Sequence, residues 1–151
     1  MGSGKSTVGR MLASRLGWPH VDLDELLAAR HGPVGEQIRA EGESVFRERE
    51  RAAVRELCDG VVRVLTPGGG AFCDPVSGPA LREGYRTVWL RAPLSTLAER
   101  VRGTDRPLFD RAERLLAERE PLYALAERAV DATREPDRIV EELLAMVEEG
   151  A

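Results

Sequence analysis

The first residues of the chain could bind phosphate. Residues 2–7 match the second half of the pattern GxxxxGK[ST]. In that pattern a tight turn and the start of a helix aim backbone N–H groups at phosphate oxygens, the lysine adds a positive charge, and the next serine can ligate Mg²⁺. The residues of this candidate phosphate loop are Gly2, Ser3, Gly4, Lys5, Ser6 and Thr7. A simpler interpretation is a glycine-rich loop before an ordinary helix that Ser6 or Thr7 caps.

Lys5 is the only lysine in the sequence, because all the other basic residues among the 22 are arginines. A coding bias toward arginine explains the scarcity of lysine elsewhere. The phosphate loop has nevertheless kept a compact ammonium group, where the planar fork of an arginine would not fit.

Two carboxylates follow the next apolar run. Asp22 and Asp24 lie two positions apart, so in extended geometry they would project from the same face. One could hold the hydration shell of Mg²⁺, and the other could orient and deprotonate an attacking hydroxyl group. Asp24 could instead be the N-cap or a first-turn acid of the following helix.

Two further segments could recognise a small anion. Arg47 and Glu50 are three residues apart on an expected helix, so the glutamate could steady the arginine. Taken alone, this segment would be a solvated, charged helix face. The run Gly68-Gly69-Gly70 follows an expected strand and would let a small ligand approach the main chain closely, whereas a plain turn needs fewer glycines.

The elements that must position these residues follow an alternating pattern. Segments of helical period alternate with short β-branched runs, which predicts an α/β fold with a mostly parallel sheet. We expect strands at 20–23, 61–65, 87–90 and 129–131, and helices at 8–16, 24–30, 34–40, 43–57, 75–82, 93–102, 111–127 with a break near Pro121, and 136–149. Tight and polar loops are expected at 67–70 and 103–110. No repeat or linker divides the chain, so we expect one domain over residues 1–151.

Composition excludes several classes of protein. The net charge of −4, with acids and bases mixed along the chain, gives no basic stripe for nucleic acid. No apolar run approaches the roughly 20 residues that a membrane span requires. Cys58 and Cys73 have neither CxxC spacing nor a paired histidine, so we expect no zinc site and no disulfide, and a reducing cytoplasm as the location.

The ordered set of motifs resembles the shikimate kinase family over essentially the whole chain. It comprises the phosphate loop, the segment 21–24, the pair Arg47 and Glu50, the glycines with Ala71, and the segments 106–108 and 119–123. The resemblance implies a three-layer P-loop NTPase fold and a monomer. It also implies ATP-dependent phosphorylation of the 3-hydroxyl of shikimate, giving shikimate 3-phosphate and ADP in aromatic amino acid biosynthesis.

The resemblance also assigns roles on the nucleotide side. Lys5 and the backbone of residues 2–7 would hold the phosphates of ATP, with Ser6 on Mg²⁺ and Asp22 assisting the metal through water. Arg106, on a lid at about residues 103–110, would close over the transferring phosphoryl group. Arg134 would bracket the adenine.

On the acceptor side, the resemblance assigns a shikimate-binding region at about residues 24–60. Asp24 would orient the hydroxyl group and act as its base. Arg47 and Arg119 would clamp the carboxylate of shikimate, and the backbone of Gly68, Gly69 and Gly70 would contact the ring hydroxyls. Without the resemblance, Arg106 and Arg119 would be an ordinary loop arginine and an ordinary helix-face arginine.

The family pattern is incomplete at the start of the chain. The first glycine of the phosphate loop and the strand before it are missing, and that strand is normally central in the sheet. We expect Met1 to be an internal methionine, with roughly ten residues upstream that include this strand. Its absence should leave two neighbouring strands unpaired.

Two alternatives remain open from the sequence. One is a P-loop kinase for another small hydroxyl compound, such as gluconate; the pair of arginines and the three glycines favour shikimate. The other is an inactive nucleotide-binding module, which the missing strand keeps open.

Overall fold

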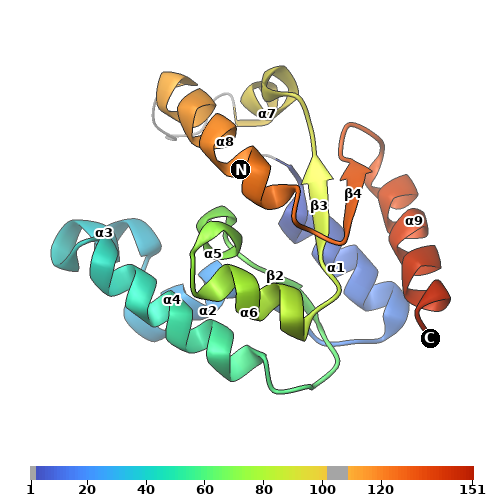
Figure 1. Cartoon of the computed structure of the whole chain (residues 1–151), viewed down its shortest axis with the longest axis horizontal. Helices are drawn as coiled ribbons and strands as arrows, with labels where there is room; N and C mark the ends of the chain where they lie inside the picture. Colours follow the sequence, from blue (N-terminus) through green and yellow to red (C-terminus); the bar gives the residue numbers. More distant parts are fainter. Residues whose placement is uncertain (1–2, 102–108) are drawn as a thin grey trace.

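The chain folds into an α/β structure in which helices surround two short parallel ladders (Figure 1). The structure is a computed structural model, and it describes residues 3–101 and 109–151. The helices are α1 (Lys5–Leu16), α2 (Leu23–His31), α3 (Val34–Glu41), α4 (Glu43–Leu57), α5 (Gly69–Cys73), α6 (Ser77–Gly84), α7 (Leu94–Val101), α8 (Phe109–Tyr123) and α9 (Pro136–Glu149). The strands are β1 (His20–Asp22), β2 (Val64–Thr66), β3 (Val88–Arg91) and β4 (Arg128–Asp131).

The expected parallel sheet is present, but it is split in two. β1 pairs in parallel with β2, from His20 opposite Val64 to Asp22 opposite Thr66. β3 pairs in parallel with β4 over the whole length of both strands. Within the described residues, no ladder joins β2 to β3. We expected two neighbouring strands to be left unpaired along their facing edges, and β2 and β3 are such a pair in this structure.

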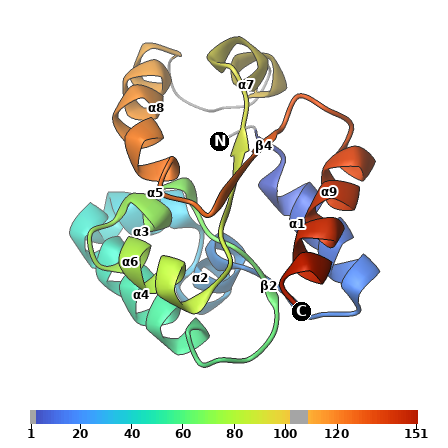
Figure 2. The same ribbon diagram turned by 45° about the vertical axis from the view of Figure 1, so that its right-hand side comes forward.

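Helices pack around both ladders, and α1 contacts β1 and β2 as well as α9. α2 to α6 lie together near β1 and β2, whereas α1 and α9 lie side by side across the molecule, in both views of the ribbon (Figures 1 and 2). α9 buries Ile139, Val140, Leu143 and Met146, which share one face at helical spacing, against Val8 of α1. A second core contains Leu23, Leu27, Phe46, Val54 and Leu81. No helix in the described ranges is both long and apolar enough to span a membrane.

Several boundaries differ from the sequence-based expectation, among them that of β2, which begins at Val64 instead of residue 61. The second of the three glycines begins the short helix α5, so the expected loop at 67–70 is partly wrong. α6 begins at Ser77, because the carboxylate of Asp74 accepts hydrogen bonds from the backbone N–H groups of Val76 and Ser77 at 3.0 and 2.9 Å. α8 contains Pro121 and ends at Tyr123, which corrects the expected end at residue 127.

Asp74 also supports a prediction about stability. Its buried carboxylate pairs with Arg51 at 2.7 Å, and this hydrogen-bonded pair holds the pKa of Asp74 well below its ordinary value. An acidic group whose pKa is lower in the folded state stabilises the protein at pH values above its unfolded-state pKa, which is about 3.9 for aspartate. This stabilisation is lost as the pH falls toward the folded-state pKa. We expect Asp74→Asn to lower the free energy of unfolding at pH 7 by about 1–3 kcal/mol, which lowers the melting temperature by several degrees. The difference in melting temperature between the variant and the parent should shrink below about pH 4.

The check is thermal unfolding of both proteins from pH 7 down to pH 3. Glu56→Gln is the control, because Glu56 pairs with Arg30 where both side chains are exposed. A difference between Asp74→Asn and the parent that stays constant across this range would contradict the prediction.

Candidate active site

The phosphate loop leads into the first turn of α1. Gly4 is the residue before the helix and has φ of 86°, a left-handed conformation that favours glycine. No side chain caps this end of α1, so the interpretation of Ser6 or Thr7 as a cap is wrong. Backbone N–H groups of a first turn that lacks such a cap can bind an anion. Gly2 lies outside the described residues.

Ser6 and Asp22 form a pair beside this loop. The hydroxyl of Ser6 donates a hydrogen bond to Asp22 Oδ2 at 2.8 Å, and Asp22 Oδ1 accepts one from the backbone N–H of Glu25 at 3.1 Å. Asp22, rather than Asp24, is therefore the N-cap of α2. The serine and the carboxylate offer the oxygen ligands that Mg²⁺ prefers. One or two such protein groups are enough where phosphate oxygens and water molecules supply the other ligands.

The expectation that Asp22 and Asp24 project together from one strand is wrong. β1 ends at Asp22, and the chain enters α2 at Leu23, so Asp24 already lies in the first helical turn. The two carboxylates consequently face different neighbours. Asp22 meets Ser6, whereas Asp24 meets the glycine run.

The three glycines are where the predicted acceptor residues converge. A Cβ atom on Gly68 would lie 2.9 Å from Asp24 Oδ1. One on Gly69 would lie 3.2 Å from Arg119 Nη1, and one on Gly70 would lie 2.5 Å from Arg47 Nη1. Side chains from α2, α8 and α4 thus occupy the space that larger residues would need. This close approach explains why three glycines stand in a row.

Arg47 is held by a buried carboxylate. Its Nη1 donates to Glu50 Oε1 at 2.6 Å, and the Glu50 side chain is only 1% exposed. Burial raises the pKa of Glu50, and Arg47 offsets part of that rise. Burial is the largest single influence on Arg47 and lowers its pKa, but the hydrogen bonds and negative charges of Glu50 and Glu43 together outweigh burial and raise the pKa. The expectation that Glu50 steadies Arg47 is confirmed.

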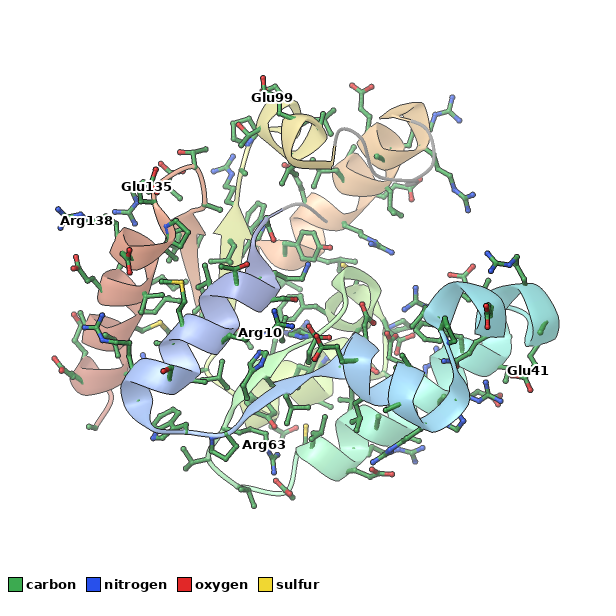
Figure 3. The ribbon with its side chains drawn as sticks, turned by 180° about the vertical axis from the view of Figure 1, so that it is seen from behind. Arg10, Glu41, Arg63, Glu99, Glu135 and Arg138 are labelled. Atoms are coloured by element: carbon green, nitrogen blue, oxygen red, sulfur yellow. The ribbon has the colours of Figure 1, made fainter. Side chains whose placement is uncertain are left out.

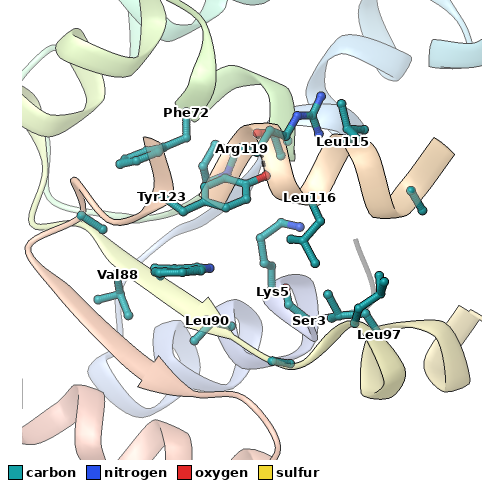
Figure 4. Close-up of a pocket in the computed structure, with 18 residues that line it drawn as sticks. Ser3, Lys5, Phe72, Val88, Leu90, Leu97, Leu115, Leu116, Arg119 and Tyr123 are labelled. Atoms are coloured by element: carbon teal, nitrogen blue, oxygen red, sulfur yellow. Dashed lines mark hydrogen bonds between the residues drawn. The ribbon is translucent and has the colours of Figure 1, made fainter. Parts of the chain in front are cut away.

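A cavity of about 130 Å³ joins the phosphate loop to the acceptor residues (Figure 4). Ser3 and Lys5 line it from the phosphate loop, Gly68 and Gly69 from the start of α5, and Arg119 from α8. The structure thus places five predicted site residues around one space.

Asp24, Arg47 and Gly70 do not line this cavity, although Asp24 and Arg47 lie against the glycine run at its wall. Arg134 is outside the lining of the cavity and pairs with Glu142 of α9. Arg106 falls outside the described residues, as does most of the expected lid.

Tyr123 and Cys73 also belong to the site, although the sequence pointed to neither as a functional residue. The Tyr123 hydroxyl donates to the carbonyl oxygen of Gly69 at 3.0 Å, and its ring lies between those of Phe72 and Trp89. Burial raises the pKa of both Tyr123 and Cys73, and the positive charge of Arg119 offsets part of that rise. The spacing of Arg119 and Tyr123, one helical turn apart, could have identified the tyrosine.

Comparisons with known proteins agree with this geometry. The family model described as "SKI: Shikimate kinase" matches residues 1–148. The shikimate kinase of Paramagnetospirillum magneticum is 46% identical over 110 residues, which are 72% of this chain and 56% of that relative. The shikimate kinase of Moorella thermoacetica is 44% identical over 110 residues, 72% of this chain and 64% of that relative. The chain therefore matches less than two thirds of the length of these relatives.

Solved structures extend the likeness to the whole fold. Shikimate kinase from Acinetobacter baumannii in complex with shikimate superposes with a TM-score of 0.89 at 28% identity, covering 99% of this chain and 89% of that one. A gluconokinase from Sinorhizobium meliloti reaches a TM-score of 0.70 at 27% identity, covering 100% of this chain and 89% of that one. From its phosphate loop through the glycine run to α9, the chain belongs to the shikimate kinase family.

Proposed function

We propose that the chain transfers the terminal phosphoryl group of ATP to the 3-hydroxyl of shikimate, giving shikimate 3-phosphate and ADP in aromatic amino acid biosynthesis. One observation carries the proposal: Asp24, Arg119 and Arg47 each lie against one of three consecutive glycines. Lys5 lines the same cavity as two of those glycines, so phosphate and acceptor would meet there. The names of the relatives and the shikimate complex of the Acinetobacter baumannii enzyme support the choice of acceptor.

On the phosphate side, the ammonium of Lys5 and the N–H groups at the start of α1 would neutralise and orient the phosphates. Ser6 and Asp22 would hold Mg²⁺, Asp22 through a water molecule. The bound metal ion would supply positive charge for the phosphate oxygens. Gly2 and Thr7 would add backbone contacts to the phosphate loop.

On the acceptor side, Arg47 and Arg119 would bind the carboxylate of shikimate. A hydrogen bond to a charged group contributes about 1.5–3 kcal/mol, so two such contacts give about 3–6 kcal/mol. That is a preference of roughly 10² to 10⁴ over an uncharged polyol. Asp24 would accept the proton of the 3-hydroxyl of shikimate. The oxygen of that hydroxyl would form a bond to the γ-phosphorus of ATP, while the bond between this phosphorus and the leaving ADP breaks.

Further roles extend this proposal. Arg106 would close over the transferring group from a lid at about residues 103–110, and Arg134 would contact the adenine. The remainder of the shikimate-binding region at about residues 24–60 would support the ring. The protein would act as a monomer in the cytoplasm, as one domain over residues 1–151.

A coupled assay of ADP release with shikimate, gluconate and nucleoside monophosphates tests the proposal. Of the three kinds of acceptor, we expect only shikimate to give a rate of ADP release clearly above background. A higher rate with gluconate would favour the alternative acceptor. Binding of ATP by titration calorimetry without turnover on any acceptor would instead indicate an inactive nucleotide-binding module.

Gly70→Ala should selectively weaken acceptor binding. The new methyl group would occupy the position of the Arg47 guanidinium, which would have to leave its place beside Glu50. Losing one charged contact raises KM for shikimate by about tenfold or more. Steady-state kinetics with each substrate varied in turn would measure this effect, and KM for ATP should stay near the parent value. Because the buried carboxylate of Glu50 would lose its partner, we also expect a lower melting temperature. An equal rise in both KM values would indicate general damage instead.

A further inference from the structure

Tyr123 carries a hydroxyl group to which the proposed reaction gives no role. The residue lies in the last turn of α8, four positions after Arg119, so the two side chains leave the same face of the helix. The hydroxyl donates a hydrogen bond to the carbonyl oxygen of Gly69 at 3.0 Å. Figure 4 shows Arg119 and Tyr123 next to each other in the wall of the cavity. This hydrogen bond therefore joins α8 to α5 at the point where Arg119 meets the glycines.

Arg119 lies beside the same hydroxyl group. A Cβ atom on Gly69 would lie 2.9 Å from the Tyr123 hydroxyl oxygen and 3.2 Å from Arg119 Nη1, so both side chains share the space over this glycine. Burial is the main influence on the pKa of Tyr123 and raises it, whereas the charge of Arg119 and its hydrogen bond to the hydroxyl lower it. A hydroxyl group can donate one hydrogen bond and accept two. That of Tyr123 can therefore donate to Gly69 while it accepts from Arg119.

The ring of Tyr123 is held in place by two other rings. Its centroid lies 6.3 Å from that of Phe72 on α5 and 5.9 Å from that of Trp89 on β3, with interplanar angles of 33° and 35°. Aromatic pairs at such separations attract each other. Because these contacts come from two different elements, they fix the direction in which the hydroxyl group points.

The backbone on both sides of this hydrogen bond is weakly restrained by its own residues. Pro121 lies inside α8, between Arg119 and Tyr123, and a proline removes one backbone hydrogen bond from a helix. On the other side, the three consecutive glycines lack side chains that would restrict their backbone. A contact that joins the two segments can therefore determine where Arg119 lies relative to the glycines.

We propose that Tyr123 is a positioning residue for the acceptor: its hydroxyl group holds the guanidinium of Arg119 over Gly69, in the place where Arg119 binds the carboxylate of the acceptor. This inference rests on the proposed function, in which Arg119 is one of two arginines that bind that carboxylate. Tyr123 acts through Arg119 and not on the reacting atoms. Loss of the hydroxyl should therefore weaken acceptor binding and leave the transfer step nearly unchanged.

Tyr85, the other tyrosine of the chain, provides a matched control. Its hydroxyl also donates to a backbone carbonyl oxygen, that of Leu57 at 2.5 Å, and accepts from an arginine, Arg63, at 3.0 Å. Burial raises its pKa as well. Neither Tyr85 nor Arg63 lines the cavity beside the phosphate loop, and Figure 3 shows Arg63 at the end of the molecule opposite α7.

Steady-state kinetics of Tyr123→Phe and Tyr85→Phe test the proposal. Phenylalanine keeps the ring and removes only the hydroxyl group. We expect Tyr123→Phe to raise KM for shikimate by about three- to tenfold, with kcat and KM for ATP near the parent values. Tyr85→Phe should leave all three constants unchanged, even if it lowers the melting temperature as much as Tyr123→Phe does. An unchanged KM for shikimate in Tyr123→Phe, or an equal rise in both variants, would overturn the proposal.

A double-variant cycle identifies the residue through which Tyr123 acts. The four proteins are the parent, Tyr123→Phe, Arg119→Ala and the variant that carries both changes. In the background of Arg119→Ala, removal of the Tyr123 hydroxyl should leave kcat/KM for shikimate nearly unchanged, because the group that it positions is already absent. If the two losses multiplied in the double variant, Tyr123 would not act through Arg119 and the proposal would be wrong.

NMR relaxation measures the positioning without any acceptor. The order parameter of the Arg119 Nε–H bond should fall in Tyr123→Phe toward the values below about 0.6 that mark a flexible group, and it should keep its parent value in Tyr85→Phe. This measurement separates the inference from the proposed function. A parent chain without shikimate turnover would contradict the function alone, whereas an Arg119 that stays equally ordered in Tyr123→Phe would contradict the positioning role.

Discussion

A Lys5→Arg variant should keep its fold, and its kcat for the proposed phosphorylation of shikimate should fall by about 10²–10³-fold or more. Lys5 directly follows Gly4, whose left-handed backbone sets the turn, and it lines the cavity together with Ser3 and Arg119. The guanidinium group is wider than an ammonium group and spreads its charge over a planar fork. In this narrow space it would displace the phosphates from the first turn of α1. Steady-state ADP release and the melting temperature together measure the two expectations.

Arg10→Lys is the matched control for this variant. Arg10 lies on the same helix, and its side chain is 56% exposed in an ion pair with Glu25. The reverse exchange at this surface position should change neither kcat nor stability, because exposed ion pairs contribute little. Near-normal turnover in Lys5→Arg would refute the role assigned to the lysine.

The sequence predicts the helices well because their signals are local. α9 is an example: Pro136 begins it, and Ile139, Leu143 and Met146 recur at helical spacing, so its predicted and observed bounds agree. β2 is less well predicted. Val61 and Val62 have strand composition but lie outside it, because β1 offers a partner only from His20 onward. Strand length depends on the neighbouring strand, which local composition does not contain.

In the candidate site, too, the features that depend on adjacent residues could be predicted, and those that depend on distant parts of the chain could not. The phosphate loop can be recognised locally, because its glycines and lysine are adjacent in sequence. The separate surroundings of Asp22 and Asp24 could not be predicted, since they depend on a helix that begins between the two residues. The contact of Arg119 with Gly69 joins α8 to α5 across about fifty residues. Only the folded chain shows that each of the three glycines faces a different site residue.

Asp24→Asn should lower kcat by about 10²–10⁴-fold, the usual contribution of a general base, with little change in KM for shikimate. The amide keeps the shape of the carboxylate beside Gly68 but cannot take the proton of the acceptor hydroxyl. Single-turnover measurements with saturating shikimate would separate this loss of chemistry from a loss of binding.

Asp22→Asn gives the contrast that identifies the base. Asp22 bonds to Ser6, so the loss of its charge should weaken metal binding, whereas an asparagine at this position can still cap α2 and should cost little stability. Excess Mg²⁺ should therefore restore part of the activity of Asp22→Asn and none of that of Asp24→Asn, because added metal replaces lost affinity but does not accept a proton. If excess Mg²⁺ rescued both variants alike, Asp24 would be a metal ligand rather than the base, and proton transfer would have to be assigned to another group at the glycine run.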